Sequence, residues 1–471
     1  MSPLRSPSRG GALPAGRLLR ILFYVDAEVF LHKFRTDLLQ EALVGGVMNI
    51  EIEVELRNRE APLTDELLAR YDEIWFFLWR ERGPGELPLA DAETAALLVW
   101  MDRGGGVLIT GDHAAEYREG HAIRYEGLGA HVGRRIPRAR HMRAWDEPPG
   151  PEVDQADTVD SFDGGLPLQL EKDAVPQRLL LPVNDRAEPH VIFRDSQGRT
   201  LDRFPDHRHE GRVKVTITPG AQMDPLIVGE WPPNSPAPEI IARGVNWRLG
   251  RTEDLMAQWD GHRVQSTEPS VHGRIIADSS FHHYAYDNLA EIAASGGRNW
   301  EKITEIYRNL AAWLAPPDVR SAYGLRALDW VIQHPYVVAV AGAELTVVGE
   351  VARRLLAEVL PGAWLHELVD DLLKQLAGKR PPLAPRLSFD VFLLGAHVRQ
   401  LAAVANPALP VEGIEQIVVR GGPVRGTAGV RELQARVLGE AHRSYDIVSA
   451  RNKQQEDERK RLDLKFPPGE E

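Results

Sequence analysis

Strand-like and helix-like segments alternate through the first 115 residues, and this alternation constrains the fold more than any other feature of the chain. Apolar or period-two runs of strand length predict strands at residues 18–26, 50–56, 73–79 and 107–110. The stretches between them predict helices at 34–44, from Thr64 onward and at 91–101. Strands and helices that alternate at this spacing form βαβ units around a parallel sheet. We therefore expect an α/β protein with a flavodoxin-like, doubly wound parallel sheet.

The regular alternation stops near residue 113, and we interpret residues 113–235 as a long insertion in the α/β domain. Short strands are predicted inside it at 191–193 (VIF) and 212–217 (RVKVTI). The α/β pattern resumes with a buried strand at 273–277 (GRIIA) and a helix over 300–314.

Two adjacent prolines, Pro316 and Pro317, mark the predicted end of the α/β domain, which we assign to residues 18–317. Beyond them apolar residues recur with helical periodicity, so residues 318–450 are predicted to form a helical C-terminal domain. We expect residues 1–17 to be a flexible tail and residues 451–471 to be a charged tail.

The composition excludes several classes of chemistry and of partner. The 471 residues include no cysteine, which removes disulfides, zinc–thiolate sites, iron–sulfur clusters and cysteine nucleophiles. The formal net charge, 56 − 68 = −12, argues against nucleic-acid binding because contacts to phosphates need a positive field. No window approaches ~20 uninterrupted apolar residues, so no membrane span is expected. We expect a cytoplasmic protein that acts on a small molecule.

Polar side chains follow the predicted strands at the points where the chain leaves the sheet. Because ligands of open parallel sheets bind beyond the carboxyl ends of the strands, these side chains are predicted to share one edge. The candidate catalytic residues are the acids and imidazoles Asp112, His113, Asp278, His282 and His283. The candidate substrate-binding residues are Asp26, Arg80, Arg138 and Arg140. Polar residues after strands also serve as ordinary helix caps and turn formers, and this alternative stays open.

Carboxylates and imidazoles also suit a divalent metal such as Zn, Fe or Mn where cysteine is absent. The candidate ligands are Asp112, His113, His207, His209 and His283. Their spacing matches no specific metal motif such as His-Glu-x-x-His. Two further interpretations of the histidines therefore stay open, as acid–base groups without a metal or as hydrogen-bonding partners of turns.

Three runs of sequence resemble a known family. YDEIWFF at 71–77, GGGVLITGDH at 104–113 and GRIIADSSFHH at 273–283 resemble the ThuA-like branch of the class I glutamine amidotransferase-like fold. The resemblance covers about residues 18–315. It implies that Gly111, Asp112 and His113 occupy the place of the amidotransferase nucleophile, with His282 or His283 near the place of its histidine. Without cysteine, the thioester chemistry of glutaminases cannot occur in this chain.

Members of the ThuA-like group are linked to disaccharide utilisation, so the resemblance implies a carbohydrate-derived substrate. The leading hypothesis is a hydrolase or related enzyme that acts on a small polar substrate at the carboxyl edge of the sheet, with or without a metal. The alternative hypothesis is a non-catalytic ligand-sensing or protein-interaction module, whose helical C-terminal domain binds a protein partner.

Overall fold

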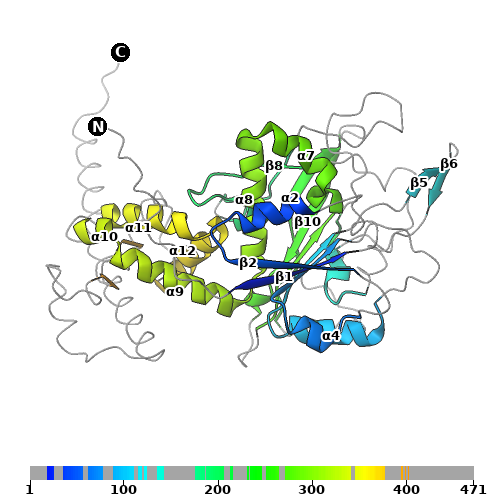
Figure 1. Ribbon diagram of the computed structural model, residues 1–471, viewed down its shortest axis with the longest axis horizontal. Coiled ribbons are helices and arrows are strands. Elements are labelled where there is room, and N and C mark those ends of the chain that lie inside the picture. Colours follow the sequence, from blue (N-terminus) through cyan, green and yellow to red (C-terminus); the bar gives the residue numbers. More distant parts are fainter. Residues whose placement is uncertain are drawn as a thin grey trace, which may run out of the picture. The chain divides into compact units, whose positions relative to one another are not determined.

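The computed structural model of the chain is drawn in Figure 1. It describes residues 18–25, 36–56, 62–77, 89–110, 115–118, 121–124, 135–142, 176–205 except 186, 213–215, 231–246 except 233, 251–264, 271–340, 345–376, 394–395, 398 and 401–402. The chain divides into two compact units, residues 1–324 with 360–366 and residues 325–359 with 367–471.

A seven-stranded mixed sheet forms the centre of the first unit. Its spatial order is β2-β1-β3-β4-β11-β10-β9. The strands are β1 (Leu19–Val25), β2 (Ile50–Leu56), β3 (Glu73–Phe77), β4 (Gly106–Thr110), β9 (Glu239–Asn246), β10 (Arg251–Trp259) and β11 (Ile275–Asp278). The first five strands in this order pair in parallel, and β10 and β9 add an antiparallel edge. The parallel part has the 2-1-3-4-5 order of flavodoxin-like sheets, which confirms the predicted fold class.

Helices cover both faces of this sheet, as Figure 1 shows with α4 on one side and α2, α7 and α8 on the other. The helices of this region are α2 (Asp37–Val44), α3 (Asp65–Leu68), α4 (Asp91–Met101), α7 (Tyr286–Ser295) and α8 (Gly297–Leu314). Thr64 caps α3 as predicted, because its side-chain oxygen accepts the N–H of Leu67 at 3.2 Å. Because helices cover both faces of the sheet, all five residues of β3 are buried.

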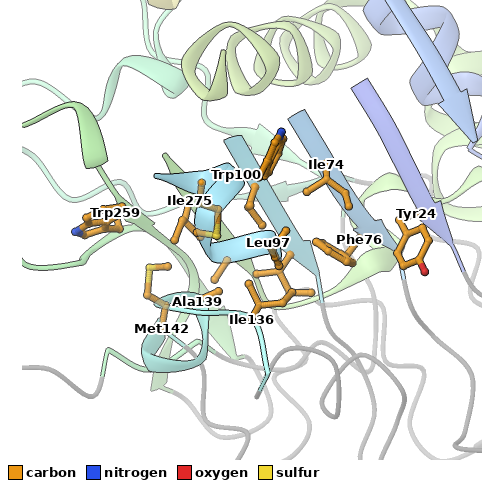
Figure 2. Close-up of a cluster of buried hydrophobic side chains, with 14 of the residues drawn as sticks. Tyr24, Ile74, Phe76, Leu97, Trp100, Ile136, Ala139, Met142, Trp259 and Ile275 are labelled. Atoms are coloured by element: carbon orange, nitrogen blue, oxygen red, sulfur yellow. The ribbon is translucent and has the colours of Figure 1, made fainter. Parts of the chain in front are cut away.

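The core on the α4 side is built from side chains that alternate along the parallel strands (Figure 2). Ile74 and Phe76 of β3 face Leu97 and Trp100 of α4 across this layer. The segment 135–142 adds Ile136, Ala139 and Met142 to the same cluster. A part of the predicted insertion is therefore packed into the core of the α/β unit.

On the opposite face aromatic rings fill the space between the sheet and the other helices. Phe23 stacks on Trp75 with ring centroids 5.4 Å apart, and Phe77 lies 5.5 Å from Tyr284. Aromatic pairs at these spacings stabilise a core beyond the apolar area that they bury.

Three elements differ from the sequence-based expectation. In the described part of the strand predicted at 212–217, residues 213–215, the structure has only a bridge at Val213 and no strand. Residues 191–193 were predicted to be a strand, and this is wrong: they form a 3₁₀ helix, η2 (Val191–Phe193), after His190. Asn309 of α8 donates to the carbonyls of Ile192 and Arg194, so contacts with α8 decide the local conformation there. Strand β10 was not predicted, because its register shifts near Met256 interrupt the period-two pattern.

The described residues after 316 are mainly helical, as predicted. Its helices are α9 (Pro317–Gln333), α10 (Pro335–Val340), α11 (Leu345–Val359) and α12 (Gly362–Leu376). Pro317 begins α9, where its missing N–H leaves no helical bond unmade. Within the part of the chain that the structure describes, no helix is both long and apolar enough to cross a membrane.

Candidate functional site

Asp278 is the last residue of β11, and its Cα pairs with that of Thr110 at the end of β4. Both residues therefore lie at the carboxyl edge of the parallel strands. Thr110 donates its hydroxyl to the carbonyl of Phe76 in β3, at 2.8 Å, which ties the ends of these strands together. This edge is where ligands of open α/β sheets bind, so the structure places Asp278 where a site was predicted.

The carboxylate of Asp278 is the centre of a buried hydrogen-bond network. Its Oδ1 lies 2.7 Å from Nδ1 of His283, and it also accepts the backbone N–H of Ser280 at 3.0 Å. Its Oδ2 accepts the hydroxyl of Tyr284 at 2.8 Å. All four residues are fully buried. A buried carboxylate is stable only when such donors satisfy it, and here three different groups do so.

A short turn of the chain creates this network. After β11 the backbone enters a 3₁₀ helix, η4 (Phe281–Tyr284), and Ser280 caps it by accepting the N–H of His282 at 3.2 Å. The tight turn brings His283 and Tyr284 back to the carboxylate five and six residues earlier. The sequence D-S-S-F-H-H-Y therefore builds the network locally.

The two tyrosines of the network stay protonated. Burial raises the pKa of Tyr284 well above its ordinary value, and the negative charge of Asp278 and the hydrogen bond to it raise it further. Burial and the charge of Asp278 likewise raise the pKa of Tyr307. Tyr284 thus donates to Asp278, and Tyr307 donates to the backbone carbonyl of His283.

The imidazole of His283 has one nitrogen on Asp278 and the other turned toward a two-stranded ribbon. Because Nδ1 lies against a carboxylate, we assign the proton of the neutral ring to Nδ1, which leaves the lone pair on Nε2. Nε2 lies 3.5 Å from Nε2 of Gln177, and the ring of Phe204 packs 4.8 Å from the imidazole. A carboxylate-oriented imidazole of this kind can accept and return a proton at Nε2.

The other candidate catalytic residues lie in different surroundings or outside the described residues. His282 is buried, and its ring lies 4.0 Å from that of Phe281. Six candidates fall outside the residues that the structure describes: Asp26, Arg80, Asp112, His113, His207 and His209. Thr110 is the last described residue before Asp112 and His113, and Pro205 is the last before His207 and His209.

The described residues include one of the predicted metal ligands, His283. Among the described residues, no three histidines, aspartates or glutamates come together in a way that could hold a metal ion. Of the predicted ligands only His283 is described, so the metal site stays a prediction.

Arg138, predicted together with Arg140 to bind substrate, lies at the other end of the strands. Arg138 is 2% exposed and pairs with Asp102 at 2.5 Å, and the same Asp102 oxygen lies 2.8 Å from Nδ1 of His272. Asp102 precedes β4 and His272 precedes β11, so this cluster is at the amino ends of the strands. The structure does not bring Arg138 to Asp278.

Local contacts explain the position of both arginines. The guanidinium of Arg138 lies 5.0 Å from the ring of Trp259, and its backbone has a φ of 66°, which costs a non-glycine residue about 1–2 kcal/mol. Its ion pair and its place between core residues hold that conformation. Arg140 donates from Nε to Nε2 of His141 at 3.1 Å.

Sequence reasoning missed Tyr284 and Gln177 as partners of the network. Tyr284 follows directly after the two histidines. Its short spacing from Asp278 in the sequence could therefore have predicted that it lies near the carboxylate. Gln177 is 106 residues from His283 and lies in the insertion, where no motif marked it.

Comparisons with known proteins add little to this geometry. No protein-family model and no curated protein matches the chain. Among solved structures, the chain is similar to a protein of Parabacteroides merdae ATCC 43184 that is provisionally described as ThuA-like. The two share 13% identity at a TM-score of 0.31, over 63% of this chain and 90% of the other. A likeness at this level supports no inference about the site or the reaction.

Proposed function

We propose that the protein is a hydrolase or related enzyme that acts on a small polar substrate at the carboxyl edge of the sheet, with His283 as its acid–base group. The observation that supports this proposal is the contact between Asp278 and Nδ1 of His283, at 2.7 Å. A base whose ring is oriented by a third group is the arrangement that hydrolytic enzymes use to activate a nucleophile.

In this proposal Nε2 of His283 removes a proton from the attacking hydroxyl or water and later returns it to the leaving group. Asp278 keeps the ring in the required tautomer and stabilises the imidazolium that forms when Nε2 is protonated. Ser280 and Tyr284 donate hydrogen bonds to Asp278, so its charge stays in place during both steps. A proton transfer of this kind contributes about 10²–10⁴-fold to a rate.

Two finer assignments belong to the same proposal. We assign the α/β unit to the ThuA-like branch and its substrate to carbohydrate derivatives, on the sequence runs at 104–113 and 273–283. We also keep a divalent metal as a candidate cofactor, because the residue types at Asp112, His113, His207 and His209 suit Zn, Fe or Mn. Metal analysis of the purified chain, with and without the His207→Ala substitution, tests the second assignment.

The proposal is tested by turnover of chromogenic esters, phosphates and glycosides by the full chain and three variants. His283→Gln and Asp278→Asn are each expected to lower kcat by about 10²–10⁴-fold with a smaller change in KM. His282→Gln is the matched control, because the two histidines are adjacent and both buried, and the contact that supports the proposal is that of His283 with Asp278. Equal losses in all three variants would contradict the assignment of His283.

One observation favours the non-catalytic alternative, a ligand-sensing or protein-interaction module. Neither Asp278 nor His283 has any exposed surface, which is typical of a structural network. A sensor would be stabilised by its ligand by an amount that grows with the logarithm of ligand concentration above Kd, with no turnover. This alternative would be favoured if a carbohydrate derivative raised the Tm of the wild-type chain and the wild-type chain turned over none of the three substrate classes.

A further inference from the structure

A small ribbon of the insertion lies over the imidazole of His283. Strand β7 (Gln177–Arg178) pairs with β8 (Arg203–Phe204) in antiparallel register, with Gln177 opposite Phe204. Both of these side chains are buried against His283, with Phe204 at 4.8 Å from its ring. The ribbon therefore lies on the side of the imidazole that does not contact Asp278.

Gln177 makes one strong and one weak contact from the same nitrogen. Its Nε2 donates to the carbonyl of Pro205 at 2.8 Å, within the ribbon, and lies 3.5 Å from Nε2 of His283. Side-chain hydrogen bonds weaken steeply at such distances, so the contact with His283 adds little attraction. The amide nitrogen carries only donors, so it faces the imidazole nitrogen as a hydrogen-bond donor would.

The ribbon and the neighbouring segment 190–195 are attached to the rest of the unit in different ways. Segment 190–195 is held by buried bonds, from Asn309 to the carbonyls of Ile192 and Arg194 and between His366 and the carbonyl of Asp195. The ribbon is tied to α8 by an ion pair between Lys302 and Asp202, whose side chains are 20% and 24% exposed, and by the buried ring of Phe204, 6.1 Å from that of Tyr307. Partly exposed ion pairs contribute little to stability, so the ion pair is easier to break than the buried bonds of segment 190–195.

We infer that the β7–β8 ribbon is a displaceable cover of His283, and that the Gln177 amide occupies the place of the substrate group that meets Nε2. This inference rests on the proposed function and names the substrate class more narrowly. The group that replaces the amide must also be a donor, so the substrate presents a hydroxyl or an N–H to His283. A hydroxyl of a sugar derivative and a water molecule both satisfy this requirement.

The cover is tested by the access of a chemical probe to His283 in the full chain. Diethyl pyrocarbonate acylates neutral imidazoles that solvent can reach, and peptide mass spectrometry separates modified His283 from other histidines. Modification of a buried group tracks the population of the open form. The Lys302→Met and Gln177→Ala variants are expected to raise the modification rate of His283 by about tenfold, because the first removes the ion pair to α8 and the second removes the bond from Gln177 to Pro205 and the amide that faces Nε2.

Two controls separate opening of the ribbon from general loosening of the fold. His366 is buried beneath Asp195 outside the ribbon, and its modification rate is expected to stay at the wild-type value. Arg178→Met changes the ribbon at a side chain that is 72% exposed, and is expected to leave His283 as unreactive as in the wild type.

The inference is wrong if both folded variants keep His283 as unreactive as in the wild type, or if His366 gains reactivity in parallel. Either result would make the ribbon a fixed part of the core. This readout does not depend on turnover, so a His283→Gln variant that keeps full activity would refute the proposed function and leave the opening of the ribbon standing.

Discussion

Oε2 of Glu73, at the first position of β3, accepts the indole N–H of Trp75 at 2.9 Å, and neither side chain is exposed. Burial raises the pKa of this carboxyl well above its ordinary value, against the lowering effect of the Trp75 hydrogen bond, and the charge of Asp72 raises it further. The α/β core of the folded chain therefore favours the protonated form of this carboxyl.

This protonation makes stability depend on pH. In the unfolded chain Glu73 ionises near its ordinary value of about 4.3, whereas in the folded chain it keeps its proton to higher pH. The stability it supports is complete below the unfolded pKa and falls as the pH rises through the folded pKa, by at most about 1.4 kcal/mol per pH unit. We expect Glu73→Gln to remove this fall, as measured by urea unfolding at pH 5 and pH 7. Identical pH dependence in both proteins would contradict the assignment.

The ion pair between Asp260 and Arg274 is expected to be a main support of the amino ends of β4 and β11. Arg274 donates from Nε to Asp260 Oδ1 at 2.8 Å, and both side chains are at most 4% exposed. Asp260→Asn is expected to lower the free energy of unfolding by about 3–5 kcal/mol, because it leaves the Arg274 charge buried without its carboxylate. Arg263→Met is the control, because Arg263 contacts the same carboxylate but is 62% exposed, and about 0–1 kcal/mol is expected.

The same pair predicts a loss of stability in acid. Burial alone would raise the pKa of Asp260, but the charge and hydrogen bond of Arg274 outweigh it and lower the pKa below its ordinary value. The contribution of Asp260 is therefore present above the unfolded pKa of about 3.9 and is lost as the pH falls through the lower folded pKa. Thermal unfolding between pH 5 and pH 2 should show a steeper loss in the wild type than in Asp260→Asn.

Arg138 is expected to act on stability and not on substrate binding. Arg138→Met should cost about 1.5–3 kcal/mol, because it removes a hydrogen bond between charged groups and leaves Asp102 with His272 alone among the contacts described above. Arg135→Met, which removes the exposed pair with Asp91, is the control and should cost about 0–1 kcal/mol. If Arg138→Met left stability unchanged and raised KM, the substrate-binding role predicted from the sequence would be restored.

Tyr284 is expected to position Asp278 through its hydroxyl alone. Tyr284→Phe keeps the ring against Phe77 and removes the bond to the carboxylate, so a loss of about 1.5–3 kcal/mol is expected. Tyr307→Phe removes a bond to the neutral carbonyl of His283 and should cost less, about 0.5–1.5 kcal/mol. Chemical denaturation of both variants gives the comparison, and an equal cost would contradict the expectation that the bond to Asp278 is the stronger of the two.

Local patterns predicted the parallel core of the fold well. The strands at 50–56 and 107–110 and the helix at 91–101 lie within one residue of the predicted bounds, because period-two and helical patterns report directly which faces are buried. The same patterns gave a wrong prediction for residues 191–193, because a run of three apolar residues is too short to show a period. The conformation there depends instead on the hydrogen bonds from Asn309.

The sequence by itself determined that Asp278 ends a buried strand and that His283 follows it by one short turn, since both facts depend on residues a few positions apart. Only the tertiary structure decided that Gln177 lies against His283 from 106 residues away, and that Arg138 lies with Asp102 at the opposite strand ends. The physical reason is that side-chain periodicity carries information about burial, whereas the pairing of distant segments depends on how their surfaces pack together.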